Sequence, residues 1–258
     1  MSRLTQKGAV GVLSLFKTIS ESVTTAPYSE SFTFAGERFD SADGREFVLV
    51  LNGTVALVSG NLVQSAPITA AHQNLDVTAY TAANASTGAA ASVTATLGAG
   101  AVTANQYAGG FVVVNDNTGE GQTLKIASHP AADASASLTV TLEDAPVTAL
   151  SATSEICLIP NPYTSVVVNP TTATNTPIGV TLYPIAASVA STTNVFGLIQ
   201  SKGPISALAQ GTIGVGLGIM PSTSVAGAVA VIDATGANIG RALQAGVDTE
   251  YRAVFIDL

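Results

Sequence analysis

The sequence predicts an all-β protein with little helix, built from two to three small β-sandwich or β-barrel units. Thr and Val are abundant, whereas the straight-chain helix formers Glu, Lys, Arg and Leu are sparse. Apolar and polar residues alternate over short runs, as in strands that bury one face. Gly, Pro, Asn and Asp, which favour turns, separate these runs. The runs that predict strands are residues 31–39, 46–58, 91–97, 110–116, 137–144, 163–170, 178–185 and 250–258.

Residues 1–35 lack a clean period, and we expect an extended N-terminal arm that orders against a partner. The apolar run GAVGVLSLF near the start is too short for a convincing signal peptide. Lys17 and Glu21 follow it before any small-residue cleavage site. The chain is therefore expected to be made and used without export.

Residues 36–160 predict one or more β domains with hairpins and turns rich in Ala, Thr and Ser. The strand at 46–51 is followed by Asn52-Gly53, a pair that suits a type I′ turn, and then by a second strand at 54–58. Asp43-Gly44 marks another turn just before this hairpin. Residues 112–126 predict a further hairpin.

Four prolines at positions 160, 162, 170 and 177 predict strand edges and crossings, because proline cannot donate to a β-ladder. A domain boundary is therefore placed near residue 160, with a C-terminal β domain over 161–258. From Ile156 to Ile232 the only charged residue is Lys202. Exposed β-surfaces normally carry charge, so this stretch suggests a surface covered by other subunits.

The composition narrows the function classes. Charged residues make up 10% of the 258 residues, against about 25% in typical domains. The formal charge is −8 and the nine basic residues are scattered singly, which argues against a nucleic-acid partner. No run reaches the 18 or so apolar residues of a membrane span, so no membrane partner is expected. A single cysteine, Cys157, excludes an internal disulfide framework and is expected to be a buried, inert thiol.

The segment GTIGVGLGIMP at 211–221 is dense in glycine but does not predict a nucleotide site. In either register of a dinucleotide fingerprint, the third glycine is replaced, by Ile219 or by Pro221. More strand and turn residues follow rather than a helix. The glycines are interpreted as bends or close backbone approaches.

No catalytic, cofactor-binding or metal-ligating residue is predicted elsewhere. Residues 115–120 begin like a calcium loop, but position twelve is Ala127 rather than Glu, so a hairpin turn is favoured, with weak adventitious calcium binding left open. His72 and His129 stand alone, without ligands at metal-binding spacing. The carboxylate pairs Glu143-Asp144 and Asp248-Glu250 are interpreted as solvated strand ends. Adjacent strand residues face opposite sides, so Glu143 and Asp144 cannot act together on one face. A Ser–His–Asp catalytic triad is not predicted, because the sequence contains no Gly-x-Ser-x-Gly nucleophile elbow.

Residues 196–258 resemble the decoration proteins of tailed-phage heads, also called capsid cement or stabilisation proteins. The similarity is carried by the strand segment Val215-Gly216-Leu217-Gly218, the Pro221-Ser222-Thr223 loop and two late strands, Ile239–Leu243 and Arg252–Ile256. It covers about the last 65 to 100 residues, as a pattern of turns and strands. Residues 36–160 look more like the extra β domains of larger phage structural proteins.

The resemblance implies a β-tulip-like or related small β-barrel fold and a non-enzymatic role. Such proteins sit as homotrimers on the outer surface of the virion capsid, after assembly in the host cytoplasm, with the major capsid protein as partner. Lambda-type members carry an N-terminal arm that orders on the capsid. A tail-fibre or adhesin-type protein that binds host carbohydrate is the alternative, although the chain has no Trp and six Tyr. A major shell protein ranks lower, because no long helical pattern is present.

Overall fold

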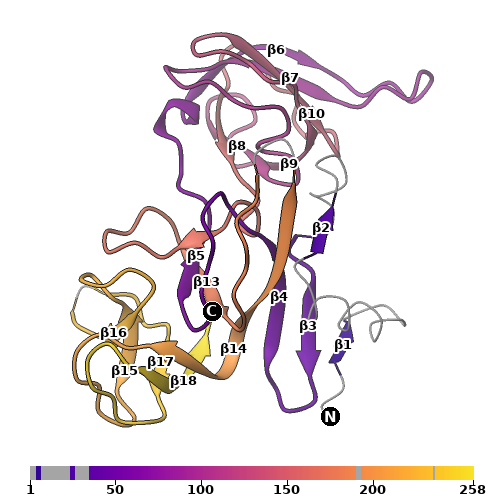
Figure 1. Ribbon diagram of the computed structural model, residues 1–258. Coiled ribbons are helices and arrows are strands. Elements are labelled where there is room, and N and C mark those ends of the chain that lie inside the picture. Colours follow the sequence, from indigo (N-terminus) through magenta and orange to yellow (C-terminus); the bar gives the residue numbers. More distant parts are fainter. Residues whose placement is uncertain (1–3, 7–23, 27–34, 190–192, 235) are drawn as a thin grey trace. The chain divides into compact units, whose positions relative to one another are not determined.

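The computed structural model describes residues 4–6, 24–26, 35–189, 193–234 and 236–258 (Figure 1). These residues form an all-β protein, which confirms the predicted fold class. The described chain contains no α-helix, and one 3₁₀ turn covers Ala70–His72. The chain divides into two compact units. Unit 1 comprises residues 1–67 and 162–258, and unit 2 comprises residues 68–161.

Unit 2 is a closed antiparallel barrel with the strand order β10-β7-β6-β11-β8-β9. Its strands are β6 (Leu75–Thr81), β7 (Ser92–Thr96), β8 (Phe111–Asp116), β9 (Thr123–Ser128), β10 (Ser137–Leu142) and β11 (Glu155–Ile159). Buried and exposed residues alternate along β7, β9 and β10, as a barrel requires. Local alternation in the sequence is therefore sufficient to specify the inward side chains of this unit.

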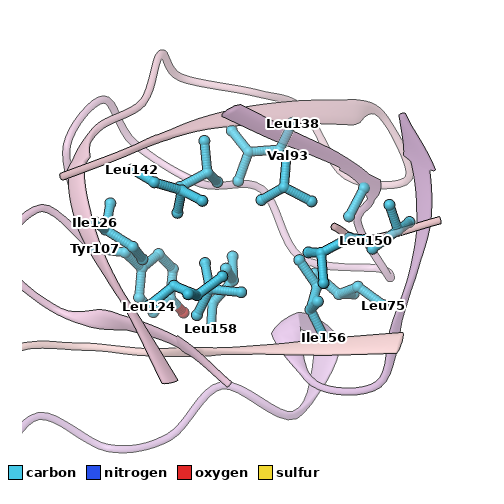
Figure 2. Close-up of a cluster of buried hydrophobic side chains, with 14 of the residues drawn as sticks. Leu75, Val93, Tyr107, Leu124, Ile126, Leu138, Leu142, Leu150, Ile156 and Leu158 are labelled. Carbon is cyan, nitrogen blue, oxygen red and sulfur yellow. The ribbon is translucent and has the colours of Figure 1, made fainter. Parts of the chain in front are cut away.

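The inward side chains form one continuous core (Figure 2). Val93, Ile126, Leu138 and Ile156 are fully buried in it, and Tyr107 contributes its ring from a loop. Aliphatic side chains of this size stabilise a fold by about 1.5–3 kcal/mol each when buried. The barrel interior is a packed core.

Unit 1 is a 12-stranded sheet whose main path is β1-β3-β4-β14-β18-β17-β15-β16. Its strands are β1 (Leu4–Gln6), β2 (Thr24–Ala26), β3 (Arg38–Ser41), β4 (Glu46–Leu51), β5 (Leu62–Gln64), β12 (Val167–Val168), β13 (Pro177–Thr181), β14 (Asn194–Leu208), β15 (Gly218–Pro221), β16 (Val229–Val231), β17 (Gly240–Ala242) and β18 (Tyr251–Asp257). The long strand β14 pairs with β4 through its first half and with β18 through its second half. It therefore links the two halves of the sheet (Figure 1).

The two halves of β14 meet at a bulge around Gly203. The register with β4 shifts between Gln200 and Lys202, and Gly203 has a φ of +98°. The buried Gln200 side chain donates hydrogen bonds to the carbonyl oxygens of Lys202 and Pro204, both at 3.0 Å. These bonds satisfy carbonyl groups that the bulge withdraws from the ladder.

The central strands of unit 1 are buried on both faces. On one face of β4, Val48 and Val50 join a cluster with Ile199 of β14. On the other face, Phe47 and Leu49 belong to a second cluster. A continuous apolar run such as EFVLVL is the sequence pattern of a strand covered on both sides.

The predicted hairpin over residues 46–58 is wrong in its turn and its second strand. Neither Asn52 nor Gly53 has a positive φ, and β4 pairs instead with β3 and β14. The Asn52 side chain donates hydrogen bonds to the carbonyl oxygens of Val55 (2.9 Å) and Ala186 (2.8 Å). The Asn52 backbone N–H donates to the carbonyl oxygen of Val195. These distant partners override the local turn preference of the Asn-Gly pair. The predicted turn at Asp43-Gly44 is present and joins β3 to β4, with Gly44 at a φ of +84°.

The division at residues 161/162 coincides with the boundary expected near residue 160. The grouping of residues 36–160 differs, because residues 36–67 lie in unit 1 with the C-terminal part of the chain. The pairing of β4 with β14 causes this difference. Of the expected arm, β1 pairs with β3 and β2 pairs with β14, while residues 1–3, 7–23 and 27–34 lie outside the described residues.

Candidate functional site

The segments weighed from the sequence become turns and strand ends. In 211–221, Gly211 and Gly216 have positive φ values and β15 starts at Gly218, in agreement with their interpretation as bends. Residues 115 and 116 end β8, and residues 117–122 connect it to β9 as the predicted hairpin turn. Glu143 lies just after β10 and pairs with Lys125 at 3.0 Å.

Cys157 differs from its expected burial. It lies on β11 between the inward-facing Ile156 and Leu158, so its own side chain faces outward and is half-buried. Its Sγ accepts a hydrogen bond from the backbone N–H of Asn74 at 3.3 Å. The prediction failed because the apolar run was interpreted without its inward and outward alternation.

The two histidines do not stand alone, because unit 2 brings both of them to Tyr107. Nδ1 of His72 lies 2.6 Å from the Tyr107 hydroxyl, and Nε2 of His129 accepts the backbone N–H of Tyr107 at 2.9 Å. The His72 and Tyr107 rings meet edge to face at 5.6 Å. All three side chains are buried, with exposed fractions of 1 to 4%. No local pattern in the sequence indicates this triad, since His72 and His129 lie 35 and 22 positions from Tyr107.

The partners determine which ring nitrogens carry protons. Nε2 of His72 faces the Gly100 carbonyl oxygen at 3.1 Å, so it donates there and leaves Nδ1 to accept from the Tyr107 hydroxyl. Nδ1 of His129 donates to the Pro130 carbonyl oxygen at 2.8 Å. Because Nε2 of His129 accepts a hydrogen bond from a backbone N–H, the His129 imidazole is neutral in this arrangement. Each of the four ring nitrogens has a hydrogen-bond partner within unit 2.

Burial shifts the pKa values of His129 and Tyr107 away from their ordinary values. Desolvation lowers the pKa of His129, the Pro130 carbonyl opposes that shift, and the neighbouring His72 adds to it. Burial likewise raises the pKa of Tyr107. The triad is thus a buried hydrogen-bonded network inside unit 2.

Unit 1 contains the exposed apolar side chains. Among the described residues, ten of the twelve exposed large hydrophobic side chains belong to unit 1. Two of them, Tyr251 and Phe255, lie on the outward face of β18, whose inward residues Val254 and Ile256 are fully buried. The ten are Val55, Val58, Tyr183, Val189, Val215, Leu217, Leu243, Val247, Tyr251 and Phe255.

Two surface grooves flank the outward side of β18. One, of about 540 Å³, is lined by Tyr251 together with Tyr183, Val58 and Arg45. The other, of about 430 Å³, is lined by Phe255 together with Leu243 and Arg241. We call the outward side chains Pro204, Ser206, Leu243, Tyr251 and Phe255 the apolar face. Pro204 and Phe255 are direct cross-strand neighbours on β14 and β18.

Charge divides differently between the units. Unit 2 contains seven Asp and Glu against one Lys, a net charge of −6, whereas the sequence of unit 1 contains ten against eight, a net charge of −2. The nearly neutral segment predicted from the sequence belongs mainly to unit 1. Part of its neutrality reflects burial, since Asn194–Ser201 of β14 is buried throughout. Another part is exposed, including Tyr183 and Val215.

No protein-family model, curated protein or solved structure matches this chain. Within the described residues, no group of three or more His, Cys, Asp or Glu side chains is placed to hold a metal ion. The same residues contain no helix that is both long enough and apolar enough to cross a membrane.

Proposed function

We propose that this chain is a non-enzymatic virion structural protein that binds the outer surface of a phage capsid and stabilises it. The partner is the major capsid protein, and the chain acts as a homotrimer on the capsid. The proposal starts from the resemblance of residues 196–258 to head decoration proteins. It assigns attachment to unit 1.

The observation that carries the proposal is the apolar face on β14, β18 and Leu243, the residue that follows β17. Exposed apolar side chains gathered on one surface mark interaction sites, and aromatic side chains are enriched at interfaces. Tyr251 and Phe255 are half-exposed on this face, whereas Val254 and Ile256 on the opposite face of β18 are fully buried. The face falls within the same 63 residues that resemble decoration proteins, 196–258.

Charge supports an outer position on the capsid. Unit 2 has one Lys and seven acidic residues, so it offers no cluster of cations that neutralises phosphates. An acidic, solvent-facing unit is compatible with the outside of a shell that encloses DNA.

The test is co-sedimentation of the purified chain with expanded and unexpanded heads of the phage that encodes it. We expect binding to expanded heads, reduced at least tenfold in the Tyr251→Ser/Phe255→Ser variant. Val147→Ser is the matched control, because Val147 is 99% exposed on unit 2. Deleting residues 1–35 tests the arm in the same assay. Failure of the unaltered chain to bind either form of head contradicts the proposal. If the Tyr251→Ser/Phe255→Ser variant binds as well as the Val147→Ser control, the apolar face is not the surface that contacts the capsid.

A host- or carbohydrate-binding role is the second candidate, favoured by one observation. Tyr183 and Tyr251 line one groove together with Arg45 and the buried Gln200. Aromatic faces combined with a few polar groups are the usual lining of small-ligand sites. Glycan-array binding that is lost in Tyr183→Ala supports this alternative, and absence of binding to every glycan counts against it.

A further inference from the structure

We infer that the closed end of unit 2 around Tyr107 is an acid-sensitive latch, which opens when His129 takes up a proton. The inference does not depend on the proposed function. It rests on the hydrogen-bond geometry of the His72–Tyr107–His129 triad and on what this triad connects.

The triad joins three segments that are not strands of the barrel. His72 ends the 3₁₀ turn, Tyr107 lies in the loop between β7 and β8, and His129 lies in the loop between β9 and β10. Backbone bonds reinforce the connection, with Asn105 N–H donating to the His129 carbonyl at 3.0 Å and Val102 pairing with Ala132. Since Tyr107 also packs in the barrel core (Figure 2), separating these loops exposes apolar side chains.

His129 cannot accept a second proton in this arrangement. Its Nε2 lone pair already accepts the Tyr107 backbone N–H, so a proton added to Nε2 would point at the amide hydrogen and be repelled by it. Its Nδ1 proton is already directed at the Pro130 carbonyl oxygen. Protonation therefore requires the Tyr107 backbone to move away, and it places a charge in a site that excludes water.

Apart from the Pro130 carbonyl oxygen, which already accepts from Nδ1, the described residues around His129 offer no compensation for that charge. The titratable groups that face it are Tyr107, whose ring lies 6.0 Å away, and His72, whose proximity adds to the lowering of the His129 pKa. Among the described residues, no carboxylate forms an ion pair with either imidazole. Asn105, which accepts the His129 backbone N–H through Oδ1, is neutral.

The direction of the pH dependence follows from the lowered pKa of His129. An unfolded or opened chain has a histidine pKa of about 6.5, so it binds the proton more readily than the closed form does. The contribution of His129 to the closed state is fully present above pH 6.5. It is lost as the pH falls from there through the lowered pKa of the closed state.

The test is hydrogen–deuterium exchange of the full chain at pH 7.5 and pH 5.0, corrected for intrinsic exchange rates. We expect protection in residues 98–110 and 129–136 to fall at least tenfold at pH 5.0, while β4 and β14 keep theirs. His129→Gln keeps an acceptor for the Tyr107 N–H but takes no proton. In this variant the protection of residues 98–110 and 129–136 is expected to be the same at both pH values. Asp133→Asn, an exposed titratable residue in the same loop, is expected to respond like the unaltered chain. Equal protection at both pH values, or an unchanged response in His129→Gln, overturns the inference.

A second measurement covers the case in which His129→Gln fails to fold. NMR titration of the unaltered chain follows the His129 ring directly, and its tautomer at pH 7.5 is expected to be Nδ1–H. The ring is expected to change protonation only together with the opening of residues 98–110. Protonation of His129 near pH 6.5 with these residues still protected overturns the inference.

Discussion

The two units of this chain are built from the same β-rich composition but bury their side chains differently. Strands of unit 2 alternate between a packed interior and solvent, as β9 and β10 illustrate. The central strands of unit 1, β4 and β14, are covered on both faces over most of their shared length. Unit 2 concentrates negative charge and unit 1 exposes apolar side chains. In the function proposed above, unit 1 makes the contacts with the capsid and unit 2 faces solvent.

The largest expected effect tests whether the two units are independent. Leu138→Ala opens a cavity in the barrel core and is expected to lower the free energy of unfolding of unit 2 by about 2–5 kcal/mol. Ile199→Ala, in the cluster that β4 and β14 share, is expected to lower the free energy of unfolding of unit 1 by a similar amount. Amide exchange under increasing denaturant measures each unit separately. If either substitution lowers the stability of both units equally, the chain unfolds as one cooperative body and the comparison fails.

A smaller effect is expected at the bulge of β14. Gly203→Ala is expected to destabilise unit 1 by about 2–3 kcal/mol, because the left-handed backbone disfavours a side chain by about 1–2 kcal/mol and a close contact is added. A Cβ built on Gly203 lies 2.8 Å from Cγ of Arg45.

Gly211→Ala is the control for this effect. Gly211 also has a positive φ but nothing lies within 4 Å of its built Cβ, so a loss of about 1–2 kcal/mol is expected. Chemical denaturation compares the two variants. An equal loss in both shows that the approach of Arg45 to β14 contributes nothing.

The smallest effect concerns surface charge on unit 2. Lys125 and Glu143 form an exposed ion pair at 3.0 Å, and Lys125 is the one basic residue among positions 68–161. A double-mutant cycle with Lys125→Met and Glu143→Gln is expected to give a coupling below about 1 kcal/mol. A larger coupling at physiological salt shows that unit 2 depends on this pair rather than on its core.

The sequence was sufficient for the strands β7 to β10 of unit 2, although it did not predict β6 at Leu75–Thr81. Alternating runs such as SLTVTL identify the inward residues Leu138 and Val140, because the side-chain period of a strand equals the period of the pattern. The turn at residues 117–121 was likewise predictable, since Asn117 and Gly119 adopt the positive φ values that these residue types favour. The glycines of 211–221 were interpreted correctly for the same reason.

Only the tertiary structure decided which strands pair and which polar groups meet. The Asn-Gly turn at positions 52–53 fails because Asn52 bonds Ala186 and Val195, more than 130 residues downstream. His72 and His129 reach Tyr107 because loops at one end of a closed barrel converge, and no local spacing encodes that convergence. The periodicity of a strand indicates which side chains lie on which face of the sheet. Which strands pair depends instead on the free energy of contacts between distant segments. The all-β class, most of the strand positions and the lack of charge were therefore determined by the sequence, and the strand pairing, the triad and the apolar face by the fold.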